Sequence, residues 1–169
     1  YMSFLITVAV VVLFIVLMWV IKTYNTLQSG KQDIVEQSSN IQVSLQKRRD
    51  LASRIIDIAK GFSDHEKLTH LKVSASTENL SALAQHFPEL KANETYLKLM
   101  QQLEVLENGI SNKRESYNNS SKEYNVFRSS FPAMLVAGKL KFEAAPYYDA
   151  NDEESLSKLA SFSRDDAEA

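Results

Sequence analysis

His65 and Glu66 have the residue types of a zinc-peptidase site. In such a site a second histidine follows the first by four residues, because that spacing places both imidazoles on one helix face. Thr69 occupies that position here, and neither His70 nor His86 restores the pair. We therefore predict no metal site, and assign His65 a capping or solvent-facing role at a helix start.

Other catalytic motifs are missing from the sequence. There is no cysteine, which excludes thiol catalysis and Cys-ligated zinc. The four glycines are isolated, so they form no phosphate-binding loop, and no Gly-x-Ser-x-Gly motif occurs. We expect no catalytic residue, no cofactor and no enzyme activity. An enzyme or metal-binding protein built around His65 and Glu66 is the minority hypothesis.

Lys47, Arg48 and Arg49 form the densest cationic cluster of the chain. A functional interpretation is an anionic partner, either lipid headgroups or the acidic tail of a neighbouring subunit. The alternative is a solvated helix face, which we favour because Asp50 and Asp57 partly neutralise the cluster. The net charge of −2 argues against a general nucleic-acid binder.

A Tyr-Asn pair occurs twice, at Tyr117-Asn118 and at Tyr124-Asn125, seven residues apart. This spacing places both tyrosines in one seam of a helix, with their hydroxyls at its edge. We favour that packing role. The functional alternative is that the asparagines cross-link helices by hydrogen bonds.

The elements that position these residues begin with an uncharged apolar run from Tyr1 to Ile21. Twenty-one helical residues span about 31 Å, close to the hydrocarbon thickness of a bilayer. We predict a transmembrane anchor at 1–22, with Lys22 at the interface. Lysines and arginines follow the run and none precedes it, which predicts that the bulk of the protein faces the cytoplasm. The anchor residues are Phe4, Leu5, Val8, Leu13, Phe14, Leu17, Trp19 and Lys22.

A helical bundle is expected over residues 23–148. Apolar residues recur at helical spacing over 23–61, 63–86 and 93–131, and a short helix is expected over 133–142. In the third segment the mean apolar spacing is about 3.5 residues, as in coiled coils. The fold class is therefore all-α. The predicted bundle core includes Ile55, Phe62, Leu99, Leu103, Leu106, Ile110, Tyr117 and Tyr124.

Two further regions complete the prediction. Residues 149–169 are acidic, and we expect a largely disordered tail with at most a short turn near its middle. Near the membrane the apolar stripe of the first cytoplasmic helix is narrow, while Val35 and Val43 lie off its line. They are the candidate self-association surface.

Several segments resemble the LemA family in order and spacing. They include Lys60-Gly61-Phe62, Phe87-Pro88-Glu89-Leu90-Lys91-Ala92-Asn93, Tyr124-Asn125 and Phe131-Pro132. Relatives usually have a proline-containing run where this chain has Ala52-Ser53-Arg54, so we expect a straighter helix here. The resemblance implies a single-pass protein of the bacterial inner or plasma membrane, with an antiparallel bundle of about four helices and no known enzymatic activity.

Two function hypotheses follow. The first is a membrane-anchored, self-associating scaffold, in which the partners are the lipid bilayer and other copies of the chain. One branch of the family is linked to membrane shaping, so membrane organisation is the process implied. The alternative is an adaptor or regulator of another membrane protein, such as a protease or transporter.

Overall fold

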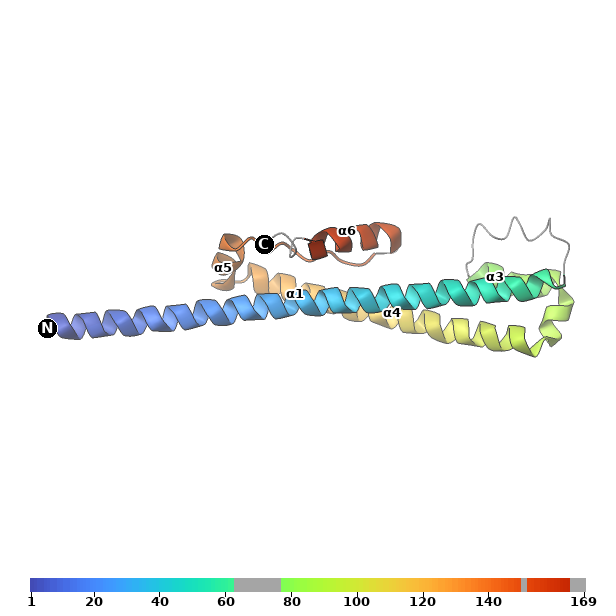
Figure 1. Ribbon diagram of the computed structural model, residues 1–169, viewed down its shortest axis with the longest axis horizontal. Helices are drawn as coiled ribbons and strands as arrows, with labels where there is room; N and C mark the ends of the chain where they lie inside the picture. Colours follow the sequence, from blue (N-terminus) through green and yellow to red (C-terminus); the bar gives the residue numbers. More distant parts are fainter. Residues whose placement is uncertain (63–76, 150–151, 165–169) are drawn as a thin grey trace. The chain divides into compact units, whose positions relative to one another are not determined.

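The computed structural model describes residues 1–62, 77–149 and 152–164, and over these ranges it is helical with no strand. Figure 1 shows the elements in chain order. The predicted all-α class is confirmed. The helices are α1 (Met2–Lys60), α3 (Thr77–His86), the 3₁₀ helix η2 (Pro88–Ala92), α4 (Glu94–Ser129), α5 (Ala133–Lys139) and α6 (Asp152–Arg164).

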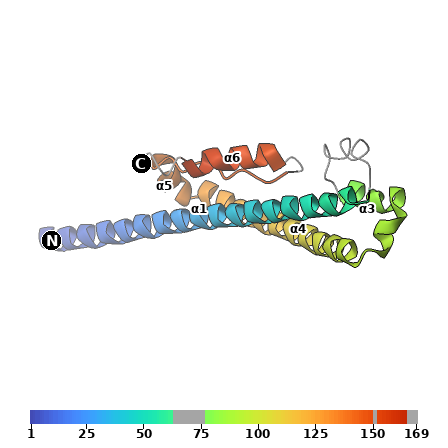
Figure 2. The same cartoon turned by 45° about the vertical axis from the view of Figure 1, so that its right-hand side comes forward.

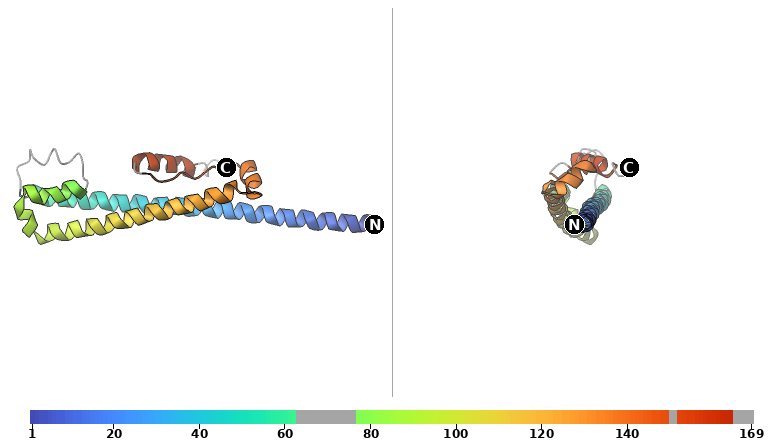
Figure 3. Two further views of the ribbon diagram at one scale, coloured as in Figure 1. Left: turned by 180° about the vertical axis from the view of Figure 1, so that it is seen from behind. Right: turned by 90° about the vertical axis from the view of Figure 1, so that its left-hand side faces the viewer.

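The chain divides into two compact units, and α1 and α4 contribute to both. Unit 1 comprises Tyr1–Ser38 and Glu115–Ala169, and unit 2 comprises Ser39–Arg114. Within each unit, α1 and α4 lie side by side in every view (Figures 1, 2 and 3). In unit 1, α5 and α6 lie on one side of this pair (Figures 1 and 3).

Helix α1 runs from the apolar run into the bundle without a break. It contains no proline, and Gly30 is its only interior glycine, so nothing in its sequence forces a kink. It passes straight through Ala52-Ser53-Arg54, as predicted. It ends before Gly61, where the Gly61 N–H bonds to the Ile58 carbonyl at 3.1 Å.

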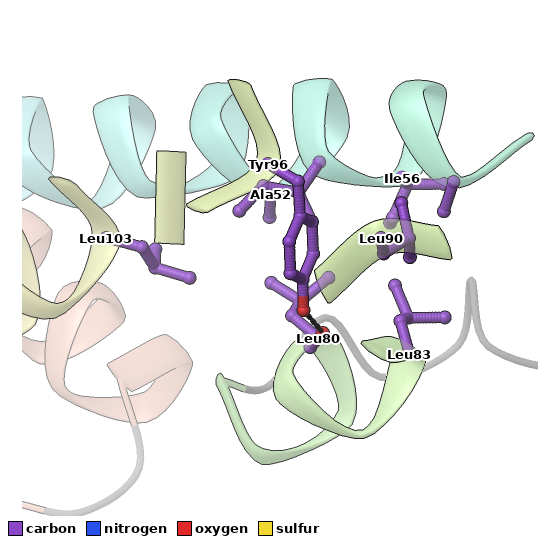
Figure 4. Packing of buried hydrophobic residues seen from close by; sticks show 9 residues of the cluster. Ala52, Ile56, Leu80, Leu83, Leu90, Tyr96 and Leu103 are labelled. Atoms are coloured by element: carbon purple, nitrogen blue, oxygen red, sulfur yellow. Dashed lines mark hydrogen bonds between the residues drawn. The ribbon is translucent and has the colours of Figure 1, made fainter. Parts of the chain in front are cut away.

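The core of unit 2 joins α1 to α3, η2 and α4 (Figure 4). The Tyr96 hydroxyl donates to the Leu80 carbonyl across this core at 2.8 Å. Asn93 caps α4 by accepting a bond from the Tyr96 N–H at 3.0 Å. The buried members are Ala52, Ile55, Ile56, Ala59, Leu80, Leu83, Leu90, Tyr96 and Leu103.

Most of the predicted core residues are buried. Ile55, Leu103, Ile110, Tyr117 and Tyr124 are buried, while Leu99 and Leu106 are half-buried. Phe62 is a correction, because its side chain is 41% exposed. The physical reason is that α1 ends at Lys60, so Phe62 lies in a turn and no longer follows the buried face of the helix.

The predicted helix bounds differ from the structure at several ends. Of the helix expected at 63–86, the structure describes α3, and residues 63–76 lie outside the described residues. The helix expected at 93–131 is α4, which ends at Ser129, and the one expected at 133–142 is α5, which ends at Lys139.

The expectation of a largely disordered tail at 149–169 is wrong for α6. This helix buries Ser155, Leu159 and Phe162, which recur at intervals of three and four residues. Burial of Leu159 and Phe162 against unit 1 outweighs the acidic composition that favoured disorder. The Phe162 ring packs edge-on to Tyr124, with centroids 6.1 Å apart, and the Lys31 ammonium lies 5.0 Å from its centre.

Candidate functional site

The apolar start of α1 is the clearest functional element. It is long and apolar enough to span a membrane, and none of its most apolar stretch is buried in the protein. All but one of the predicted anchor residues are exposed, and Trp19 is half-buried. Packing against the bundle begins at this tryptophan and is complete at Thr23, which is 4% exposed. The bundle of unit 1 therefore starts where the apolar run ends.

The cationic cluster is only partly a solvated face. Arg48 pairs with Glu107 of α4 at 2.9 Å, and both side chains are about one-third exposed. Arg49 bonds to Gln46 on the same helix at 2.7 Å. Lys47 lines a groove of about 580 Å³ within unit 2. The other residues that line this groove are Asp50, Leu51, Arg54, Lys98, Gln101, Gln102, Val105 and Leu106.

The groove is lined by both charged and apolar side chains. Lys47, Arg54 and Lys98 outnumber the single carboxylate of Asp50. Leu106 is half-buried and Val105 is 67% exposed, so apolar surface is available between the cations. Such a surface can bind an acidic segment that also carries apolar side chains.

The two asparagines of the Tyr-Asn repeat hold the segment 142–148, which we call the strap. The Asn118 amide group donates to the Tyr148 carbonyl at 2.9 Å and accepts from the Tyr148 N–H at 2.7 Å. Asn125 forms the same pair of bonds with Ala145, at 2.9 and 2.8 Å. Each asparagine thus binds one strap residue as a neighbouring β-strand would, through both backbone polar groups.

The two tyrosines of the repeat donate to the strap as well. The Tyr117 hydroxyl bonds to the Pro146 carbonyl at 2.7 Å, and the Tyr124 hydroxyl bonds to the Glu143 carbonyl at 3.1 Å. Burial raises the pKa of Tyr117 to about 12, against a lowering by the Ser121 hydroxyl. The phenol is therefore neutral and able to donate over the whole physiological pH range.

The strap and α4 match in repeat length. Phe142, Ala145 and Tyr148 face the bundle at every third position, which is the period of polyproline II. Three consecutive residues in polyproline II conformation span about 9 Å, and the seven helical residues between one Tyr-Asn pair and the next span about 10.5 Å. Because the two repeats are similar in length, Asn118 can bind Tyr148 while Asn125 binds Ala145. The later asparagine binds the earlier strap residue, so the strap runs antiparallel to α4.

The sequence prediction captured half of this arrangement. Both tyrosines are buried in the seam with their hydroxyls at its edge, as predicted. The asparagines do form cross-links, but they bind backbone groups of the strap and not another helix. The missed signal is the three-residue spacing of Phe142, Ala145 and Tyr148, which pairs with the seven-residue spacing of the asparagines.

Side chains that could bind a metal do not gather within the part of the chain that the structure describes. No group of three or more His, Asp or Glu residues there could hold a metal ion. His65, Glu66 and His70 lie outside the described residues, so the structure gives no geometry for that motif.

The two candidate self-association residues have different surroundings. Val43, in unit 2, is 52% exposed. Val35, in unit 1, is half-buried. Val43 is therefore the better placed of the two to contact a second molecule.

Fold and site together define a protein that is helical over the residues that the structure describes, with an N-terminal helix able to span a membrane and a bundle that begins where the apolar run of that helix ends. The LemA family model matches residues 69–160, and the chain belongs to the LemA family. No curated protein and no solved structure matches the chain. Family membership and the apolar helix fit a membrane-associated protein.

Proposed function

We propose that this protein is a membrane-anchored scaffold that self-associates at the bacterial inner or plasma membrane and contributes to membrane organisation. The observation that carries the proposal is the continuity of α1, which is one helix from the apolar run into unit 2. Such a helix transmits the position of the anchor to the bundle without a flexible linker. The basic residues that follow the run support a cytoplasmic location for the bundle.

Self-association is assigned to exposed apolar side chains of unit 2. Val43 is 52% exposed on α1, and Leu97 and Val105 are 50% and 67% exposed on α4. Single exposed apolar residues are common, so area alone does not establish an interface. Confinement of the anchors to two dimensions raises the effective concentration, however, which lets a modest contact assemble.

Light scattering of the full chain, in detergent and after reconstitution, tests the scaffold. We expect a defined oligomer, and Val43→Glu should reduce its size while helicity and membrane insertion are unchanged. Gln42→Glu is the matched control, since Gln42 is the neighbouring exposed residue and receives the same charge. A monomer in both environments would contradict self-association.

The groove of unit 2 supports a second function, that of an adaptor for another membrane protein. Its three cations and its apolar side chains favour an acidic, amphipathic segment of a partner. Charge reversal at Arg54 and Lys98 should abolish co-purification of such a partner without changing the oligomer. If both reversals leave the set of bound proteins unchanged, the adaptor function loses its structural support.

A further inference from the structure

Helix α5 has its small residues inside and its large apolar residues outside. Ala133, Val136 and Ala137 are 6% exposed or less. Phe131, just before the helix, is 78% exposed, Met134 and Leu135 are 48% and 59% exposed, and Leu140, just after it, is 49% exposed. We call Phe131, Met134, Leu135 and Leu140 the α5 patch. A water-exposed helix normally shows the reverse pattern, so the patch has the composition of a covered surface.

The α5 patch lies in unit 1 at the level where the apolar run of α1 ends. Phe142, two residues beyond Leu140, packs edge-on against Tyr24 with ring centroids 5.7 Å apart. Its carbonyl also accepts a 2.7 Å bond from Arg128, which fixes the turn after α5 to α4. In Figure 1, α5 is the first element beside α1 beyond its free N-terminal part.

The rise of the α-helix gives the distance of Tyr24 from the end of the apolar run, and so its depth in the bilayer. Tyr24 follows Ile21 by three residues, or about 4.5 Å along α1. The headgroup region on each side of a bilayer is about 5–8 Å thick. If Tyr1 to Ile21 spans the hydrocarbon core, Tyr24 and the Phe142 turn lie within the headgroup region.

The charged residues around the α5 patch also fit the headgroup region of a bilayer. Lys22, Lys139 and Lys141 are exposed at this end of unit 1, against the exposed carboxylate of Glu143. A surface of Phe, Leu and Met next to lysines is the composition of interfacial membrane anchors. The α5 patch has four side chains, whereas a typical stable dimer interface has about 20 to 30 residues on each side. The patch is therefore small for an interface with a second protein.

We propose that the α5 patch inserts into the headgroup region of the same membrane that holds α1, as a second point of attachment. This proposal rests on the anchor of the proposed function but not on self-association. Two attachments, joined through the Tyr24–Phe142 contact, restrict the tilt of unit 1 relative to the bilayer. The occupant of the patch is therefore lipid.

Depth-dependent fluorescence quenching of the full chain, one copy per nanodisc, tests the proposal. The chain has no cysteine, so each Leu135→Cys, Leu13→Cys or Val105→Cys variant carries one fluorophore. Lipids with a quencher near the headgroup should quench the Leu135 label several-fold more than the Val105 label in unit 2. Equal quenching at both sites would overturn the proposal. So would protection from an aqueous quencher without quenching by lipid, because a protein would then cover the patch.

The Leu13 label separates the two possible failures. For this label the lipid carries its quencher near the end of the acyl chain, because Leu13 lies about 12 Å from Ile21 along α1. If this lipid does not quench the Leu13 label, α1 is not an anchor, and the proposed function fails together with this inference. If this lipid quenches the Leu13 label but the headgroup quencher does not quench the Leu135 label, the inference fails alone. As a check on the apolar contact, Leu135→Glu should reduce quenching of a Leu140→Cys label, whereas Leu97→Glu on α4 should not.

Discussion

Gly30 of α1 lies directly against the ring of Tyr124 of α4: a Cβ added at Gly30 would be 3.0 Å from Cδ2 of that ring. The ring has little freedom to move, because its hydroxyl bonds to the Glu143 carbonyl and the ring packs in a T-shaped arrangement against Phe162. The glycine that weakens α1 as an isolated helix therefore permits α1 to lie close to the Tyr124 ring of α4.

Gly30→Ala should destabilise the protein. Alanine improves helix propensity by about 1 kcal/mol, but overpacking against an immobile ring costs about 1–3 kcal/mol. We expect a net loss of about 1 kcal/mol in the free energy of unfolding, measured by urea titration of the detergent-solubilised chain. Gly109→Ala is the control, since a Cβ there meets nothing within 4 Å, and it should stabilise by about 0.5–1 kcal/mol. Stabilisation by both substitutions would show that Tyr124 yields.

Leu103→Ala and Ile110→Ala should each destabilise the bundle by about 2–4 kcal/mol. Both side chains are buried, at 0% and 3% exposure, and truncation leaves a cavity. Lys122→Ala on the exposed face of α4 should change the free energy of unfolding by less than about 0.5 kcal/mol. Denaturant midpoints that fall equally for all three would contradict the assignment of the buried face.

The long helices were predictable from the sequence because their apolar residues recur at helical spacing over many turns. Leu103 and Ile110 belong to such a stripe and are buried. The same rule fails for Phe62, since periodicity carries no information on where a helix ends. The N-cap at Asn93 was predictable because one side-chain oxygen satisfies a free backbone N–H at the start of α4.

The strap and α6 were not predictable in this way, since each is stabilised by residues distant in sequence. Ala145 is fixed by Asn125, twenty residues earlier, and no local pattern reports that bond. Phe162 is buried against Tyr124 and Lys31, which lie on two different helices. Composition alone assigned α6 to a disordered tail because it counts charges and ignores the two apolar residues that the helix buries.

Asn125→Asp should release the strap. The replacement keeps the size of the side chain and the acceptor for the Ala145 N–H, but it places a carboxylate oxygen against the Ala145 carbonyl. Loss of this donor should cost about 1–3 kcal/mol. Hydrogen exchange at neutral pH should show faster exchange over the strap. Asn119→Asp, at an exposed position of the same helix, should leave that exchange unchanged. Unchanged protection in Asn125→Asp would mean that the tyrosine bonds alone hold the strap.

The buried phenol of Tyr117 should make the protein sensitive to alkali. Burial raises its pKa in the folded protein to about 12, from 10.0 for an unperturbed tyrosine. Up to pH 10 the phenol is protonated in both folded and unfolded chains, so its contribution is fully present. Between about pH 10 and 12 only the unfolded chain loses the proton, which favours unfolding. Stability should therefore fall as pH rises through this window, by up to about 3 kcal/mol from this residue.

Comparison with Tyr117→Phe isolates that effect from other groups that titrate in the same range. Below pH 10 the variant should be less stable by about 1 kcal/mol, because the Pro146 carbonyl loses its donor. From pH 10 to 12 the wild-type protein should lose this advantage and then become the less stable of the two. Tyr147→Phe, at a half-exposed position of the strap, should follow the wild-type curve throughout. A constant difference between wild type and Tyr117→Phe up to pH 12 would show that the Tyr117 pKa is the same in the folded and unfolded chains.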